Sequence, residues 1–198
     1  LKNFPNGSRP EQIGVKVTER YLQTPHSHWG NIDGKNKTTL ITYPDVCTWL
    51  GALWFTKATD NDELYGKLVE RFEPLFTTEK NLQPNMRPKD HNVVDFYVFG
   101  AVPLEIYKVN RDTKYLELGL KYADGQWILP ENRKDYEKQW LEKGYSWQTR
   151  LWLDDMFMIT AVHAQAYLVT GDKKYIDRAA EEMVLYLDEI QRENGLFY

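Results

Sequence analysis

The sequence predicts an all-α protein built from helical hairpins, and an internal repeat is the main reason. Three times, an aspartate is followed seventeen residues later by a second aspartate and three residues after that by a tyrosine. The copies are Asp45, Asp62 and Tyr65; Asp95, Asp112 and Tyr115; and Asp155, Asp172 and Tyr175. The last two copies lie sixty residues apart and the first two fifty apart. Repeats of this kind are typical of proteins whose helical pairs stack on their neighbours.

A leading helix precedes the first repeat. Residues 1–9 have the proline and glycine content of an extended arm, and Pro10 suits the first turn of a helix that ends near Leu22. The stretch from His26 to Lys37 is polar and rich in turn residues. After it, apolar residues recur with helical periodicity in segments near 44–58, 61–77, 93–109, 112–128, 153–169 and 172–192.

The second helix of each repeat starts at an aspartate. Asp62, Asp112 and Asp172 stand where a short carboxylate can accept the free backbone N–H groups of the first turn, so we expect three N-caps. The connections between paired helices, such as Thr170-Gly171, are short, which makes the two helices antiparallel neighbours. The first helices are apolar on most sides and the second are amphipathic, a pattern that predicts an inner and an outer layer.

The inner helices carry the other repeat aspartate near their N-terminal ends. Such a side chain needs solvent or a partner, because burying an unpaired charge is costly. We therefore expect Asp45, Asp95 and either Asp154 or Asp155 to point toward one shared centre. Adjacent residues on a helix point about 100° apart, so only one of Asp154 and Asp155 can face it. The repeat register favours Asp155.

The segment from Arg150 to Met158 is the strongest local candidate for a site. Its two adjacent carboxylates follow two tryptophans and an arginine. A proton donor that works near neutral pH needs a raised pKa, which burial and a like-charged neighbour favour and a helix N-terminus opposes. Catalysis, helix capping and salt bridging therefore all stay open for these carboxylates on local grounds.

Several other chemistries lack their usual markers. Paired aspartates suit Mg²⁺, but the Asp-rich motif of isoprenoid-condensing helical enzymes needs a further aspartate where this chain has Met158. His26 and His28 form a lone His-x-His, which is too little for zinc, and His163 is interpreted as a helix-packing residue. The sequence has no Gly-rich phosphate loop and no Gly-x-Ser-x-Gly elbow. We therefore expect no metal and no cofactor.

Composition and charge narrow the class of protein. With 42% hydrophobic residues in 198, the composition is globular, and one domain is the default. A formal net charge of −4 gives no basic excess for nucleic acid. No apolar run reaches the length of about 18 residues that a membrane span needs. The lone Cys47 can form no internal disulfide and says little about the compartment.

Four segments together resemble glycoside hydrolase family 105, the unsaturated rhamnogalacturonyl hydrolases, which are relatives of the family 88 unsaturated glucuronyl hydrolases. These segments are His91–Tyr107, Arg150–Met158, Thr170–Tyr175 and Asn194–Tyr198. The resemblance covers most of residues 10–198 and implies an (α/α)6 barrel. About three hairpins plus a leading helix are fewer than the six hairpins of that fold. We therefore expect residues 1–198 to be a single, partial α/α-toroid domain, the N-terminal half of such a barrel.

The resemblance also implies a reaction and its residues. Enzymes of this kind remove a terminal 4,5-unsaturated uronic acid from pectin-derived rhamnogalacturonan oligosaccharides by hydrating the C4=C5 double bond. The family motif, against the internal register, carries the proton-donating aspartate over to Asp154, and a second aspartate over to Asp95, with Asp155 as a helper or cap. Candidates for substrate binding are Tyr43, Trp49, His91, Trp147, Arg150 and Trp152.

Some alternatives stay open. Arg150 or His91 could bind the substrate carboxylate, but Arg150 could equally pair with Asp154 or Asp155 and lower the pKa that catalysis needs raised. The expected partner is an oligosaccharide, not nucleic acid or a membrane. A noncatalytic carbohydrate-binding scaffold, or a sugar epimerase or other glycosidase on the same toroid, are the other functions. The compartment stays open between periplasmic or secreted and cytoplasmic, with bacterial-type polysaccharide utilisation expected.

Overall fold

Helices make up nearly all the regular structure of the described part of the chain. The computed structural model describes residues 4–26, 40–84, 93–131 and 133–197. Within these segments the β-type pairing consists of an isolated bridge between Gln191 and Phe197. The chain divides into two compact units, residues 1–83 and 84–198. The single partial toroid domain expected over residues 1–198 stays a prediction.

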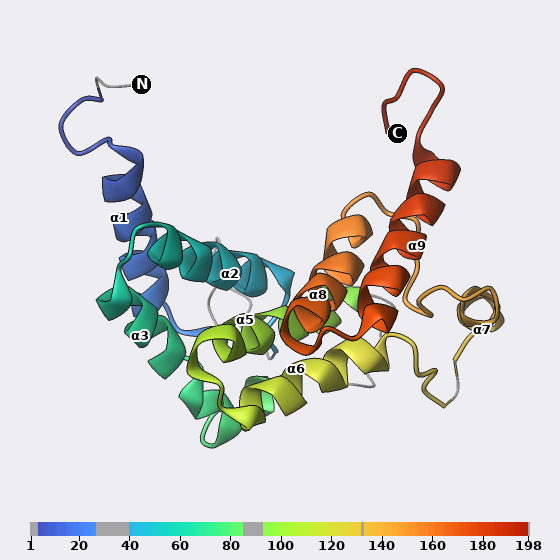
Figure 1. The fold of residues 1–198 in the computed structure, drawn as a ribbon, viewed down its shortest axis with the longest axis horizontal. Helices are drawn as coiled ribbons and strands as arrows, with labels where there is room; N and C mark the ends of the chain where they lie inside the picture. Colours follow the sequence, from blue (N-terminus) through green and yellow to red (C-terminus); the bar gives the residue numbers. More distant parts are fainter. Residues whose placement is uncertain (1–3, 27–39, 85–92, 132, 198) are drawn as a thin grey trace. The chain divides into compact units, whose positions relative to one another are not determined.

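The first unit is built around α1 (Pro10–Gln23), α2 (Tyr43–Ala58) and α3 (Asp62–Glu70), which contact one another (Figure 1). As predicted, α1 has Pro10 in its first turn. Trp49 anchors the core of this unit: its ring is fully buried and donates through Nε1 to the carbonyl oxygen of Leu68 at 3.1 Å. The predicted helix over 61–77 ends at Glu70 and is followed by short 3₁₀ turns at Glu73–Phe76 and Lys80–Leu82.

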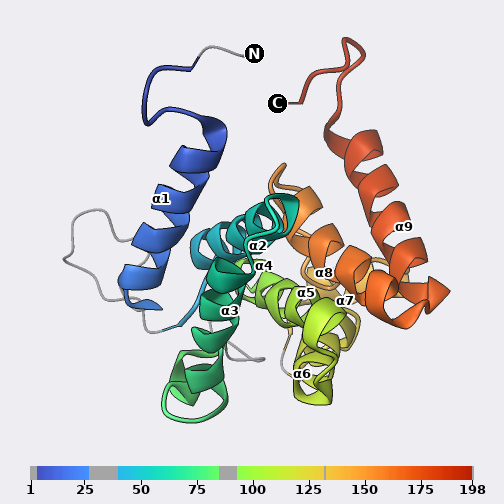
Figure 2. The ribbon, with the colours of Figure 1, turned by 60° about the vertical axis from the view of Figure 1, so that its left-hand side comes forward.

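The second unit contains two helical hairpins. The first runs from α4 (Val94–Tyr97) through a 3₁₀ turn (Val98–Gly100) into α5 (Ala101–Asn110) and returns as α6 (Thr113–Gly125). The second pairs α8 (Asp155–Thr170) with α9 (Lys173–Ile190), and Figures 1 and 2 both show these two helices running antiparallel. Helix α5 contacts both α6 and α8, so the apolar first helices of the two hairpins pack directly together, as expected of an inner layer.

Two features of the second unit differ from the prediction. The predicted helix over 93–109 is interrupted by the 3₁₀ turn Val98–Gly100. At Gly100 the chain lies very close to α6, because a Cβ there would be 2.6 Å from the Cβ of Tyr122. Helix α7 (Asp135–Glu142) was not predicted. Its eight residues give only two turns, too few for helical periodicity to stand out in the sequence.

The helix caps confirm two of the three predictions. The side chain of Asp112 accepts the backbone N–H of Lys114 at 3.1 Å, and that of Asp172 accepts the backbone N–H of Lys174 at 3.0 Å. The prediction for Asp62 is wrong by one residue. Asn61 is the N-cap of α3, its side chain accepting from Leu64 N–H at 3.0 Å, while Asp62 is already helical.

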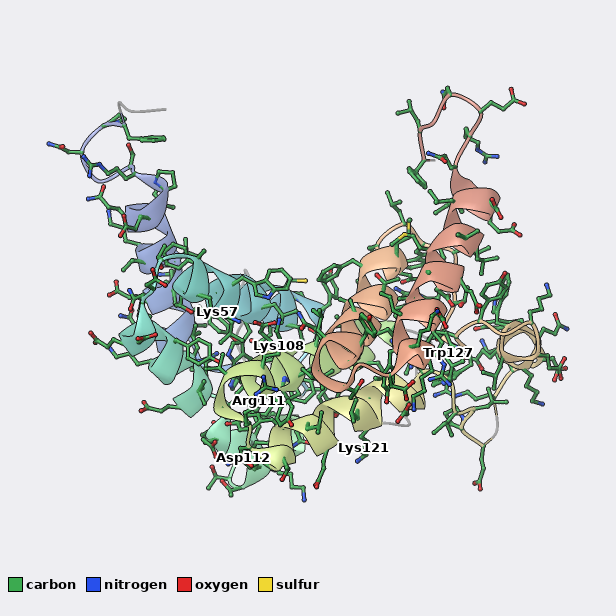
Figure 3. The ribbon with its side chains drawn as sticks, in the orientation of Figure 1. Lys57, Lys108, Arg111, Asp112, Lys121 and Trp127 are labelled. Carbon is green, nitrogen blue, oxygen red and sulfur yellow. The ribbon has the colours of Figure 1, made fainter. Side chains whose placement is uncertain are left out.

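The two hairpins of the second unit turn in the same way. Arg111 adopts left-handed backbone geometry with φ 58° at the end of α5, and Gly171 does so with φ 70° at the end of α8. Figure 3 shows Arg111 and Asp112 together at the turn from α5 into α6. Glycine adopts this geometry without steric cost, whereas arginine does not, so the first hairpin reaches the same turn with a less suitable residue.

Candidate active site

Three charged side chains from separate segments meet in the second unit. Asp95 stands in the first turn of α4, Asp155 in the first turn of α8, and Arg150 in the segment before α8. The Nη2 atom of Arg150 lies 2.9 Å from Oδ1 of Asp95 and 2.5 Å from Oδ1 of Asp155. Its Nε atom lies 3.1 and 3.2 Å from the two carboxylate oxygens of Asp155. Asp95 and Asp155 therefore converge on one guanidinium.

The charges in this cluster act on one another. Burial raises the pKa of Asp95 above its ordinary value, and the negative charges of Asp155 and Asp154 add to this, whereas Arg150 opposes it. Burial lowers the pKa of Arg150, but its hydrogen bonds and charge interactions with Asp155 and Asp95 have the larger effect. The pKa of Arg150 is therefore above its ordinary value. The guanidinium also lies 4.4 Å from the ring centre of Trp152, an attractive cation–π distance.

The adjacent aspartates Asp154 and Asp155 have different surroundings. Asp155 is fully buried and, besides Arg150, accepts a hydrogen bond from the Tyr186 hydroxyl at 3.1 Å. Asp154 is exposed and occupies the N-cap position of α8, where its side chain makes no capping hydrogen bond. Asp155 is thus committed to protein partners, while Asp154 is open to solvent and close enough for its charge to act on Asp95.

Asp45, the repeat counterpart in the first unit, is closed off from solvent. The hydroxyl of Tyr21 donates to its Oδ1, and Nδ1 of His26 lies 3.0 Å from its Oδ2. The side chains of His26 and Asp45 are each only 3% exposed. The expectation that Asp45 faces a solvated centre is therefore wrong, because buried partners satisfy its carboxylate. Sequence analysis missed His26 by considering it only together with His28, which lies outside the described residues.

The candidate sugar-binding side chains fall into two groups. Tyr43 and Trp152 are 41% and 56% exposed, and the guanidinium of Arg150 lies over the ring of Trp152. Trp49 and Trp147 lie in the cores of their units at 0% and 1% exposure, and Trp147 donates to a backbone carbonyl at 2.8 Å. Their buried positions leave no ring face for a sugar. His91 lies outside the described residues.

Two residues of α9 that the sequence did not predict for the site reach the segment that carries Arg150. The amphipathic pattern of this helix predicts a solvated position for Glu182, and that prediction is wrong, because the side chain is buried. Glu182 is fully buried and accepts the backbone N–H of Ser146 at 3.0 Å and the hydroxyl of Thr149. Burial raises the pKa of Glu182 to about 7. Tyr186, one turn further along α9, donates to Asp155. One repeat earlier, sixty residues before, these positions hold a tyrosine and a glutamine, so the repeat gives no signal for them.

His163 belongs to the core. It is fully buried between Trp127 and Tyr175, with ring centroids 4.5 and 5.7 Å away. Burial lowers the pKa of His163 to about 3, and the charge of Arg178 acts in the same direction, so the imidazole is neutral at ordinary pH. The interpretation of His163 as a packing residue is confirmed.

An apolar hollow of about 660 Å³ lies along α1 and α2 in the first unit. Phe4, Ile13, Val17 and Phe55 are among its lining residues, and none of the described residues that line it is Asp, Glu, His, Lys or Arg. The ionisable group there is the thiol of Cys47, whose pKa is raised by burial. Among the residues described, no three His, Cys, Asp or Glu side chains gather as metal ligands would. Within the same residues, no helix has the length and apolar character of a membrane span.

Comparison with known proteins places the chain in a family. The sequence model of Glycosyl Hydrolase Family 88 matches residues 12–198. The chain belongs to glycosyl hydrolase family 88. An unsaturated chondroitin disaccharide hydrolase from Streptococcus agalactiae serotype III (strain NEM316) is 26% identical to this family 88 chain over 147 residues. The match covers 74% of this chain but 36% of that relative, so the chain spans little more than a third of the relative's length. No solved structure matches this chain.

Membership of family 88 decides the fold class. The family has an (α/α)6 barrel fold, and the described residues form helices and helical hairpins, so the predicted fold class is confirmed. The resemblance to unsaturated uronyl hydrolases is confirmed at the level of family 88. The narrower assignment to family 105 stays a prediction.

Proposed function

We propose that this family 88 protein is a hydrolase that removes a terminal 4,5-unsaturated uronic acid from a short oligosaccharide. The observation that carries the proposal is the cluster in which Asp95 and Asp155 share Arg150, with the solvent-accessible Asp154 beside them. Membership of family 88 and the similarity to an unsaturated chondroitin disaccharide hydrolase support it. The cluster offers both an accessible carboxyl for proton transfer and a fixed negative charge nearby.

In the proposed reaction, Asp154 donates a proton to C4 of the unsaturated sugar. The double bond is a vinyl ether, so protonation at C4 leaves positive charge on C5 and the ring oxygen. Water then adds to C5 while Asp154, now a carboxylate, accepts one of its protons. The resulting hemiketal opens to a ketone at C5, and the hemiacetal left at C1 releases the neighbouring sugar. This route differs from ordinary glycoside cleavage by two carboxylates at the anomeric carbon.

Each acidic residue has a separate role in this proposal. Asp154 is the proton donor because Asp155 is fully buried and bonded to both Arg150 and Tyr186. Asp95 stabilises the developing positive charge as a fixed carboxylate. Arg150 holds Asp95 and Asp155, so in this proposal it organises the cluster instead of binding the substrate carboxylate. The exposed ring of Trp152 remains the nearest candidate for stacking on a sugar.

The substrate is defined by its unsaturated uronyl end. The finer proposal is a pectin-derived disaccharide, unsaturated galacturonyl-rhamnose, which follows from the resemblance to family 105. The alternative is an unsaturated chondroitin disaccharide, which follows from the name of the similar protein. Both contain the C4=C5 bond that the proposed reaction consumes, and they differ in the sugar that is released and in its linkage to the unsaturated unit.

The test measures loss of the ultraviolet absorbance of the double bond with both disaccharides and the full-length protein. The wild type should consume at least one of them, and Asp154→Asn should lower kcat/KM by at least about a hundredfold, the usual contribution of a general acid. Asp188→Asn, an exposed change on α9, is the matched control and should leave the rate unchanged.

Three outcomes would contradict the proposal in different ways. Wild-type turnover by Asp154→Asn would remove Asp154 from its role. Consumption of saturated oligosaccharides, or epimerised products, would point to a glycosidase or epimerase of another kind. A carbohydrate-dependent rise in melting temperature, without turnover of either disaccharide, would instead favour a noncatalytic binding scaffold.

A further inference from the structure

The segment that carries Arg150 is tied to helix α9 at its start. Residues 146–151 lie between α7 and α8 and are not helical. The carboxylate of Glu182 accepts the backbone N–H of Ser146 at 3.0 Å and the hydroxyl of Thr149, and all three residues are at most 1% exposed. The hydroxyl of Ser146 donates to the carbonyl oxygen of Gln126 at 3.0 Å. This end of the segment is therefore fixed by buried hydrogen bonds.

The other end is tied to the same helix through Tyr186. Glu182 and Tyr186 are four residues apart, so they lie on one face of α9. The Tyr186 hydroxyl donates to Oδ2 of Asp155 at 3.1 Å. Burial raises the pKa of Tyr186, as do the charges of Asp155 and Glu182, while the nearby backbone of Arg150 and Leu151 acts in the opposite direction. The Tyr186 hydroxyl thus holds the residue that Arg150 contacts, at the start of α8.

Between these two attachments the backbone is strained. Leu151 has φ 59°, a left-handed geometry that residues with a side chain rarely adopt. Such a residue keeps this geometry only where its surroundings impose it. Reversal of the chain at Leu151 brings Arg150 back against Asp155, five residues later, so that its guanidinium can also reach Asp95.

We infer that Glu182 and Tyr186 of α9 are positioning residues, which hold the strained segment so that Arg150 keeps Asp95 in place beside Asp154. The inference rests on the proposed function for its catalytic consequence, but not for its structural content. Neither α9 residue supplies a reacting group. Both act through Arg150, whose guanidinium is the direct contact to Asp95.

The decisive variant is Tyr186→Phe in the full-length protein, which removes one hydroxyl and keeps the buried ring. Without that donor, Asp155 draws Arg150 away from Asp95. Because Arg150 lowers the pKa of Asp95 and burial raises it, the pKa of Asp95 should then increase. We expect kcat to fall about tenfold with KM nearly unchanged, since a misplaced catalytic group affects the chemical step. The acidic limb of the kcat/KM profile should also shift to higher pH, because Asp95 needs to be ionised.

Tyr175→Phe is the matched control. Tyr175 is also a buried tyrosine of α9, but its hydroxyl contacts Asp124 at 3.2 Å instead of the cluster. The same atom is therefore removed from the same helix without touching Arg150. We expect the control to keep the wild-type kcat and pH profile.

A second readout needs no activity. In protein labelled with ¹⁵N-arginine, the Nε–H resonance of Arg150, assigned through Arg150→Gln, should move in Tyr186→Phe and stay in place in Tyr175→Phe. If the wild type consumes neither disaccharide, the proposed function fails, and this resonance still decides the positioning role. If Tyr186→Phe does not fold, Thr149→Val removes one of the two hydrogen bonds that Glu182 makes to the segment and is measured in the same two ways. Unchanged resonance and pH profile in the folded variant would overturn the inference.

Discussion

Replacing Glu182 by glutamine should change how the stability of the protein depends on pH. Burial raises the pKa of Glu182 from 4.5 to about 7 in the folded protein, with Asp155 adding to the increase and the bonds from Ser146 and Thr149 opposing it. A carboxyl with a raised folded pKa contributes stability that is fully present below pH 4.5 and is lost as pH rises through about 7. Glutamine keeps an acceptor for Ser146 and Thr149 but does not ionise.

The size of the effect follows from the two pKa values. From 4.5 to about 7 is a change of about 2.5, and at 1.36 kcal/mol per pKa unit this amounts to about 3 kcal/mol over the whole range. About 2 kcal/mol of it falls between pH 5 and pH 7. Asp95, whose pKa is also raised, acts in the same direction but is unchanged in the variant.

His163 acts in the opposite direction over the same pH interval. Its pKa falls from 6.5 to about 3 on folding, so its contribution is present above 6.5 and lost as pH falls toward 3. Between pH 5 and pH 7 this raises stability by about 2 kcal/mol, nearly the amount that Glu182 removes. In the wild type the contributions of Glu182 and His163 to the pH dependence of stability largely cancel. In Glu182→Gln the contribution of His163 remains alone, so the unfolding free energy should rise by about 2 kcal/mol from pH 5 to pH 7.

Urea unfolding of the full-length protein at pH 5, 6, 7 and 8, followed by tryptophan fluorescence, measures this directly. The quantity of interest is the difference in unfolding free energy between variant and wild type at each pH, because other titrating groups cancel in it. Glu181→Gln is the control: it is the neighbouring residue of α9 but exposed. A Glu182→Gln difference that stays constant within about 0.5 kcal/mol from pH 5 to pH 8 would refute the reasoning.

Two further predictions concern backbone geometry. Gly119→Ala should lower the unfolding free energy by about 1–3 kcal/mol, because the added methyl would lie 2.4 Å from Cγ of Leu104 and 2.9 Å from the carbonyl oxygen of Gly100. Gly66→Ala, with nothing within 4 Å, should raise it by about 0.5–1 kcal/mol, and equal stability of the two variants in urea would contradict the close approach. Arg111→Gly should also stabilise by about 0.5–1 kcal/mol by relieving the left-handed turn at φ 58°. A lower melting temperature for that variant would show that the turn carries no strain.

The fold could be predicted from the sequence where the signal is local and repeated. Helical periodicity gave α2, α8 and α9 to within about two residues, the usual uncertainty of a helix end. The cap at Asp62 failed because Asn61 can fill the same role, and the sequence does not say which of two adjacent capping residues stands outside the helix. The break at Gly100 could not be seen, because it depends on how closely another helix approaches.

The candidate site was less predictable, because its contacts join residues far apart in the chain. The repeat brought Asp95 and Asp155 to notice, but Arg150 reaches Asp95 across 55 positions and Tyr186 reaches Asp155 across 31. The sequence also did not indicate which side chains are exposed. Trp49 and Trp152 are both tryptophans near an aspartate, yet Trp49 is fully buried and Trp152 is 56% exposed. Composition identifies rings that could bind a sugar but not which of them face solvent.

The repeat itself explains why the off-register aspartate is the better catalytic candidate. In the first and third repeats, the residue in register lies in the first turn of an apolar helix and is enclosed among buried partners: Tyr21 and His26 around Asp45, Arg150 and Tyr186 around Asp155. Asp95, the counterpart in the second repeat, keeps a side chain that is 19% exposed. A carboxylate enclosed in this way stabilises the fold but cannot approach a substrate. Asp154 lies one residue outside the register and about 100° around the helix, so the same packing that encloses Asp155 leaves Asp154 exposed. The enclosed position therefore recurs at Asp45 and Asp155, while the proposed proton donor, Asp154, lies beside it.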